Sequence, residues 1–223
     1  MTSTLLSLPL FQGLTMDQMM SILEKVRIDF VSPKDEDFLH RGERQEKILF
    51  ILKGDVVREM TDPSGRCVLQ EHLYAPSLIE FSALFGRDVI AKASYRANGE
   101  VTLLSFDKHY MFDIFNHFKV VQMNMLNLLC ARIQTLQDKL LQDRGSTIAA
   151  SFLRMVNSLS ESSVGEKQLI VTRVDLADMI GCSRRHMSEE IVKWEEQGLI
   201  QIAYGRIIIP DLHLFLQMAS KRT

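Results

Sequence analysis

Two short helices joined by a glycine turn constrain the fold of this chain more than any other feature of its sequence. Thr172 is the expected N-cap of the first helix, and Gly181 ends it because glycine readily takes the left-handed conformation after a helix. Ser183 is the expected N-cap of the second helix, and Gly198 ends that one. Two helices joined by such a turn form a helix-turn-helix, whose second helix enters the major groove of DNA. The segment therefore predicts a unit that binds double-stranded DNA.

A β-hairpin is expected directly after the second helix. Tyr204-Gly205 forms the turn between residues 200–202 and 206–209, and Pro210 ends the second arm. A hairpin in this place makes the unit a winged helix-turn-helix.

The first turn of the second helix carries the side chains expected of a base-reading surface. Its sequence is Ser-Arg-Arg-His over residues 183–186. Arginine at such a place can donate two hydrogen bonds to guanine, while the serine hydroxyl and the helix-end amides suit phosphate. An isolated pair of arginines is more often a solvated surface, but the start of this helix favours DNA contact. Glu189 and Glu190 work against nonspecific affinity for DNA.

The N-terminal half has the pattern of a small β domain. A short helix capped by Thr15 comes first, and then β-rich runs alternate with turn signals such as Asp62-Pro63-Ser64-Gly65. The clearest expected strands span residues 48–52, 55–60, 68–73 and 101–106. Short strands with turns between them predict a small sandwich or barrel.

A long segment without proline or glycine, Lys108 to Asp143, is expected to be helical. Apolar residues recur in it at alternating spacings of three and four, at Leu126, Leu129, Ile133, Leu136 and Leu140. Such a heptad seam predicts pairing with a second copy of the chain. The alternative is a helix lying on the core of its own domain, because Met123, Met125 and Leu128 widen the apolar face.

The expected organisation is three parts, residues 1–115, 116–143 and 144–223. Arg144-Gly145-Ser146 is an expected hinge, a helix follows over residues 147–159, and residues 160–167 read as a polar loop.

The chain resembles the cyclic-AMP receptor/fumarate–nitrate regulator family over nearly its whole length. Residues 171–184 follow that family's helix-turn-helix closely, and residues 196–200 and 205–211 match its recognition-helix exit and wing. Arg41-Gly42-Glu43 and residues 49–54 look like its cyclic-nucleotide-binding-type jelly roll. The resemblance implies an α+β fold with an N-terminal jelly roll (a double-stranded β-helix), a long dimerisation helix and a C-terminal winged helix-turn-helix. It also implies a bacterial regulator that binds a palindromic operator as a homodimer and has RNA polymerase as a partner.

The resemblance assigns roles to eight residues near the C-terminus. Thr172 and Arg173 would contact phosphates, and Ser183 and Arg184 would lie at the groove, with Arg184 reading guanine. The remaining specificity would come from Arg185, His186, Ser188 and Glu189. Arg185, His186 and Glu189 differ from the residues of the best-known member, so the operator is expected to differ too.

The cyclic-nucleotide cassette of the family is incomplete here. Glu80 is in place for the ribose hydroxyl, but Ile79 stands where a glycine is wanted, and Ala91 or Lys92 stands where an arginine would hold phosphate. Lysine is a point charge without the bidentate fork of arginine. The candidate effector pocket consists of Glu80, Ser82, Lys92 and Ser94. We therefore expect that this domain does not bind cyclic AMP and that its effector is unknown or absent.

Metal, disulfide and catalytic sites are not indicated. Cys67, Cys130 and Cys182 form no pair or cluster with metal-ligand spacing. Haem stays open as an alternative, since the chain has potential axial ligands at His40, His72, His109 and His117. No cofactor is expected, and no apolar run approaches the roughly 18 residues of a membrane span. Because Met1 to Phe11 lacks a secretory-signal pattern, a cytoplasmic protein is expected.

Two other functions remain as alternatives to a DNA-binding regulator. One is a ligand-binding or protein-interaction module whose helix-turn-helix has lost DNA affinity, which Glu189 and the near-neutral charge of the C-terminal part favour. The other is an enzyme on a cupin-like barrel, which would need a metal cluster or a nucleophile–base pair that the sequence does not offer.

Overall fold

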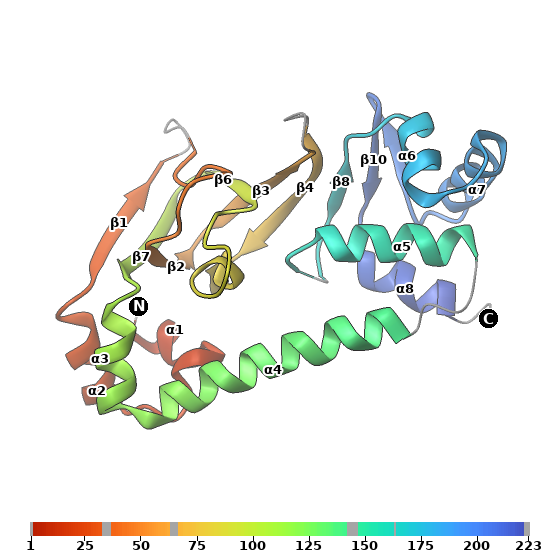
Figure 1. Cartoon of the computed structure of the whole chain (residues 1–223). Helices are drawn as coiled ribbons and strands as arrows, with labels where there is room; N and C mark the ends of the chain where they lie inside the picture. The colour runs from red at the N-terminus through yellow and green to blue at the C-terminus, as the bar shows by residue number, and fades with distance from the viewer. Residues whose placement is uncertain (1, 33–36, 63–66, 142–146, 163, 221–223) are drawn as a thin grey trace. The chain divides into compact units, whose positions relative to one another are not determined.

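The computed structural model describes all residues except 1, 33–36, 63–66, 142–146, 163 and 221–223. The expected hinge at 144–146 and most of the turn at 62–65 therefore lie outside the described residues. The chain forms two compact units, the first from Met1–Val57 and Leu73–Asp138, the second from Arg58–His72 and Lys139–Thr223. The predicted α+β arrangement of an N-terminal β unit, a long helix and a C-terminal helix-turn-helix is confirmed (Figure 1).

The first unit is built on a four-stranded antiparallel sheet. Its strands, in spatial order, are β1 (Arg27–Val31), β7 (Val101–Asp107), β2 (Lys47–Lys53) and β5 (Ser77–Ile79). The five central residues of β2 are all buried, as expected of a strand covered on both faces. Outside this sheet, β6 (Ala93–Ala97) is hydrogen-bonded to β3 (Asp55–Thr61).

The turn between β2 and β3 requires glycine at position 54. Gly54 has φ +86°, and a Cβ atom there would lie 2.4 Å from the backbone oxygen of Glu100. Both the left-handed backbone and the close approach exclude a side chain. The expected strands over residues 48–52 and 55–60 therefore follow each other across a sharp bend at Gly54, and they belong to different sheets.

Helices cover the apolar residues of the first unit. They are α1 (Thr2–Ser7), α2 (Met16–Leu23), α3 (Tyr110–His117) and α4 (Lys119–Leu141), with 3-10 turns η1 (Pro9–Phe11) and η2 (Phe81–Ala83). Thr15 caps α2 as predicted and forms a capping box with Gln18. The expected continuous helix over residues 108–143 is wrong in one respect. Phe118, with φ −127° and ψ 82°, leaves the helical conformation and separates α3 from α4.

The second unit contains the helix-turn-helix. Its helices are α5 (Ile148–Leu159), α6 (Arg173–Ile180), α7 (Arg184–Glu196) and α8 (Leu212–Ser220). Its strands follow the order β3, β4 (Cys67–Tyr74), β8 (Lys167–Leu169), β10 (Arg206–Ile209) and β9 (Gln201–Ala203). Strands β3 and β4 thus reach this unit through residues 58–72, which belong to it by their contacts.

One apolar core holds the second unit together. Leu69 of β4 is fully buried in it beside Leu169 of β8 and Phe152 of α5. Trp194, the only tryptophan of the chain, lies in the same core at 3% exposure. Its ring centroid is 4.7 Å from that of Phe152 and 5.4 Å from that of Phe215. The core therefore includes a strand from the 58–72 segment.

Candidate nucleic-acid interface

Side-chain caps at both helix starts build the helix-turn-helix. The Thr172 hydroxyl accepts a hydrogen bond from the Asp175 amide at 3.1 Å, and the Ser183 hydroxyl accepts one from the His186 amide at 3.2 Å. Gly181 ends α6 in the left-handed conformation, with φ 77° and ψ 35°. These are the two caps and the glycine turn that the sequence predicts. Loss of an N-cap hydroxyl typically costs about 1 kcal/mol, so the caps stabilise the turn appreciably.

The buried residues of α6 and α7 show which side of each helix faces the core and which side faces solvent. Leu176 and Ala177 of α6, and Met187, Ile191 and Trp194 of α7, are all in the core. The spacings of three and four on α7 fix one face inward. The opposite face of α7 is consequently presented to solvent.

The residues assigned to DNA contact lie at the start of α6 and along the first half of α7. Thr172, Arg173, Ser183, Arg184, Arg185, His186 and Glu189 are exposed, and Ser188 is half-buried. All eight lie on α6, on α7 or at their N-caps, and these two helices are packed together. Seven of the eight predicted residues are therefore exposed to solvent.

The charges on α7 are not equivalent. The Arg185 Nε atom lies 2.9 Å from Glu189 Oε1, and Lys193 Nζ lies 2.6 Å from Glu190 Oε1. The hydrogen bond to Glu190 raises the pKa of Lys193. Among the described residues, Arg184 has no such carboxylate partner. Arg184 is therefore the cation at the start of α7 that is available to an anionic or guanine ligand.

The wing is a tight hairpin between β9 and β10. Tyr204 and Gly205 both have positive φ, 50° and 76°, as a type I′ turn requires. The Tyr204 side chain is fully exposed. The Arg206 Nη1 atom donates to Gln168 Oε1 at 3.0 Å and to Gln70 Oε1 at 3.3 Å. Nothing in the local sequence indicates these last contacts, because they join strands that are far apart in the chain.

The predicted heptad seam lies exposed on α4. Leu126 is 49% exposed, Leu129 37%, Ile133 54% and Leu136 45%. The side chain of Leu140 lies outside the described residues. Of the residues that widened the apolar face, Met125 is in the core of the first unit and Leu128 packs against it, whereas Met123 is exposed. Helix α4 thus covers its own unit with one face and leaves the seam open on another.

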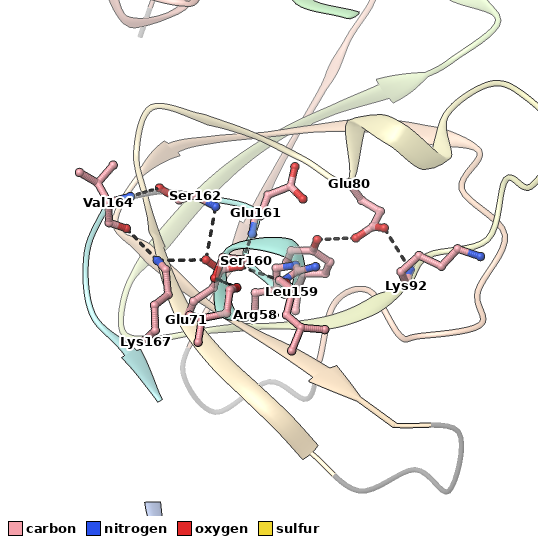
Figure 2. A network of polar contacts seen from close by, with 12 residues as sticks. Arg58, Glu71, Glu80, Lys92, Leu159, Ser160, Glu161, Ser162, Val164 and Lys167 are labelled. Carbon is pink, nitrogen blue, oxygen red and sulfur yellow. Dashed lines mark hydrogen bonds and ion pairs between the residues drawn. The ribbon is translucent and has the colours of Figure 1, made fainter. Parts of the chain in front are cut away.

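The candidate effector residues are engaged with one another and with neighbours. Glu80, only 3% exposed, has a left-handed backbone with φ 48°. Its Oε1 accepts from the Lys92 amide at 3.0 Å, which Figure 2 shows, and its Oε2 accepts from the Tyr95 hydroxyl. The Lys92 ammonium instead pairs with Asp88, and this hydrogen bond lowers the pKa of Asp88. Both carboxylate oxygens of Glu80 are therefore used within the protein.

The remaining two pocket residues do not join that carboxylate. The Ser94 hydroxyl accepts from the Arg41 amide at 3.1 Å, and Ser82 is exposed on η2. No cluster of three metal-ligating side chains is found among the described residues. None of the helices in that part of the chain has the length and apolar character to cross a membrane.

Known proteins are similar to this chain in sequence and in fold. Residues 148–218 match the family model of the Crp-like helix-turn-helix domain. The chain is 24% identical over 184 residues to the cAMP-activated global transcriptional regulator CRP of Salmonella typhimurium, covering 79% of this chain and 86% of the relative. It is 22% identical to the corresponding regulator of Pasteurella multocida, covering 79% of this chain and 87% of the relative.

Two solved structures extend the likeness to the fold. The catabolite activator protein of Thermus thermophilus matches with a TM-score of 0.52 and 20% identity, covering 97% of this chain and 100% of that one. The c-di-GMP-responsive regulator CLP of Xanthomonas campestris matches with a TM-score of 0.51 and 15% identity, covering 88% and 99%.

Proposed function

Because the chain belongs to the cyclic-AMP receptor/fumarate–nitrate regulator family of DNA-binding transcription regulators, we propose that it recognises a palindromic operator as a homodimer. The single observation that carries the proposal is the exposed Arg184, without a carboxylate partner among the described residues, at the first position of α7. In this geometry α7 enters the major groove of each half-site. Two-fold symmetry then spaces the half-sites by about 10 bp, one helical turn.

The residues of this surface divide into positioning and reading groups. Thr172 and Ser183 cap the helices, so the amides at these helix starts face phosphate, and Arg173 adds a charge beside them. Arg184 reads guanine through two hydrogen bonds. Arg185 is held by Glu189, which directs its guanidinium along α7. His186 and Ser188 complete the specificity.

Dimerisation follows from the exposed seam of α4. With Leu126 and Ile133 at a positions and Leu129 and Leu136 at d positions, Arg132 occupies a g position and Gln137 an e position of the next heptad. These two would face each other across a parallel pair of helices. Each buried Leu or Ile contributes roughly 1.5–3 kcal/mol. The described seam residues of two chains can therefore offset an association cost of roughly 4–15 kcal/mol.

The effector of the first unit is proposed to be a ligand other than cyclic AMP. Both carboxylate oxygens of Glu80 already accept hydrogen bonds, from the Tyr95 hydroxyl and the Lys92 amide, and the fully buried Ile79 occupies the place of the family's glycine. The Xanthomonas regulator that matches this fold is described as responsive to c-di-GMP, so the fold itself accepts different ligands. We propose a cytoplasmic location and RNA polymerase as a further partner, as in the family.

A second candidate function rests on the carboxylates of α7. Glu189 and Glu190 neutralise Arg185 and Lys193, which reduces the net positive charge of the outer face. A ligand-binding or protein-interaction module with a degenerate DNA-binding domain would have this property. It would not depend on Arg184.

Selection of random duplex DNA on the purified protein, followed by sequencing, tests the proposal. We expect enrichment of a palindrome at near-physiological salt. Arg184→Ala should lose the preference for one base pair in each half-site, while Arg44→Ala, an exposed change in the first unit, should not. If nothing is enriched in the presence or absence of cyclic nucleotides and haem, the interaction-module function replaces this one.

A further inference from the structure

A buried carboxylate connects the hairpin segment 58–72 to the rest of the second unit. Glu71 of β4 is fully buried, with its Oε1 atom 2.7 Å from Arg58 Nη1 and its Oε2 atom 3.1 Å from Lys167 Nζ. Lys167 is itself fully buried, and the Arg58 side chain is 6% exposed. Figure 2 shows Glu71 between the two cations. Because isolated charges are costly to bury, each of the three depends on the others.

The same carboxylate also holds the loop after α5. The amides of Glu161 and Ser162 donate to Glu71 Oε1 and Oε2 at 2.7 and 3.3 Å. The two cations complete the arrangement, since Arg58 donates to the Leu159 carbonyl at 2.8 Å and Lys167 to the Val164 carbonyl at 2.7 Å. The loop that leads into β8 therefore takes its conformation from a residue of the hairpin.

Main-chain and apolar contacts join the hairpin to the same sheet. Strand β4 pairs with β8 in antiparallel register, with Leu69 opposite Leu169, Gln70 opposite Gln168 and Glu71 opposite Lys167. In turn β8 pairs with β10, where Ile207 lies opposite Leu169. The three apolar partners are buried in the core that also contains the inner face of α7. The hairpin thus contributes Leu69 to the apolar core in which the inner face of α7 is also buried.

A ladder of polar side chains continues from the hairpin to the wing. Gln70 Nε2 donates to Glu59 Oε1 at 2.6 Å, and Gln70 Oε1 accepts from Arg206 of β10. Arg206 also donates to Gln168. The four neighbouring strands β3, β4, β8 and β10 each contribute one member of this ladder. The hairpin therefore contacts the wing as well as the core and the loop.

From these contacts we propose that the described residues of this hairpin, 58–62 and 67–72, hold the second unit in its DNA-binding conformation, and that Glu71 is the positioning residue of this arrangement. The inference rests on the proposed function, because its readout is affinity for DNA. The docked hairpin leaves Arg184 and Arg185 exposed, so docking and DNA contact are compatible. Release of the hairpin would separate β8 from β4, leave Lys167 without its carboxylate and free the wing from Gln70.

The test uses the full-length chain with its cysteines replaced by serine, and three forms of it. The first carries Glu71→Gln, an isosteric change that removes the charge. The second carries Gln70→Cys and Gln168→Cys. These two residues lie directly opposite each other in β4 and β8, and the Cα–Cα distance between such antiparallel partners falls in the range that a disulfide bridges. The third combines both changes. Affinity for the duplex enriched by selection, hydrogen exchange and Trp194 emission are measured for each, oxidised and reduced.

We expect Glu71→Gln to weaken DNA binding roughly tenfold, within the usual range of coupling between sites. The amides of Glu161 and Ser162 should exchange hydrogen faster, while the wavelength of maximum Trp194 emission stays unchanged. Oxidation of the combined variant should restore most of the affinity, and reduction should remove it again. A merely structural charge would not respond to the cross-link in this way.

Three outcomes overturn the proposal. One is DNA binding of Glu71→Gln equal to the unmodified chain. Another is weaker DNA binding by the oxidised than by the reduced form of the cysteine variant that keeps Glu71. That result would mean that the docked hairpin inhibits DNA binding. A red shift of Trp194 emission in the Glu71→Gln variant would show that its core is disturbed. In that case the oxidised cross-linked variant that keeps Glu71 tests the proposal, and DNA binding by it that is unchanged or tighter supports the proposal. The third is an unmodified chain that binds no duplex at all, which overturns the proposed function and this inference with it.

Discussion

Arg185 and Glu189 lie one helical turn apart on the exposed face of α7, with 2.9 Å between Arg185 Nε and Glu189 Oε1. The pair leaves two adjacent arginines with different environments. Arg184 faces solvent without a carboxylate partner in the described part of the chain, whereas Arg185 is oriented by its neighbour. An exposed pair of this kind contributes little to stability, so its consequence is for ligand binding.

Replacing Arg184 with alanine should cost about 1–3 kcal/mol of DNA affinity and relax the preference at one base pair of each half-site. Fluorescence anisotropy with the selected operator and singly substituted duplexes measures both effects. Arg44→Ala is the matched control. A loss of affinity that is uniform across all duplexes would assign Arg184 to phosphate contact instead.

Replacing Glu189 with glutamine should strengthen binding to nonspecific duplex DNA, because Arg185 becomes free to contact a phosphate. The logarithm of the affinity should then fall more steeply with the logarithm of salt concentration, by about 0.9 for one added phosphate contact. Titrations at several salt concentrations measure the slope. An unchanged slope would mean that Arg185 does not reach the DNA backbone.

Introducing glutamate at Leu129 and Leu136 together should give monomers, because like charges would face each other in the seam. Light scattering measures the molar mass, and binding to a half-site should be weak. Gln134→Glu changes charge on the same helix away from the seam and should remain dimeric. A double variant that stays dimeric would exclude the seam as the interface.

Cyclic AMP should not stabilise the unmodified protein against heat. A ligand at one hundred times its dissociation constant adds about 2.7 kcal/mol to the stability of the folded state. Because Tyr95 and the Lys92 amide occupy both oxygens of Glu80, we expect no concentration-dependent rise in Tm. A clear rise in differential scanning fluorimetry would show that these contacts open for the nucleotide.

Local signals account for the parts that the sequence predicts well. The caps Thr172 and Ser183 and the turn at Gly181 act within a few residues, and all three occur as predicted. The break at Phe118 was not predicted, since the segment contains neither proline nor glycine. Helix propensity alone favours a continuous helix there, and packing overrides it.

Contacts between distant residues account for what the sequence leaves out. Lys167 stands at the end of a segment that reads as a polar loop, yet it is fully buried. Its partner Glu71 and the neighbouring Arg58 come from another part of the chain. Arg58 donates a hydrogen bond to the carbonyl of Leu159, 101 residues later in the sequence. Similarly, Glu80 was predicted as a pocket residue, but its hydrogen bond from the Tyr95 hydroxyl was not. Neither pairing has a local spacing that would reveal it.

The chain passes between its two units three times, after Val57, after His72 and after Asp138. A gene fusion that joins a foreign sensor at residue 144 would therefore replace more than the sensor. It would also replace the strand beside β8, and with it the carboxylate that Lys167 requires. Exchange of sensors by recombination should succeed only where the incoming hairpin carries an acidic residue in the register of Glu71. The two halves of the gene are thus expected to be inherited together.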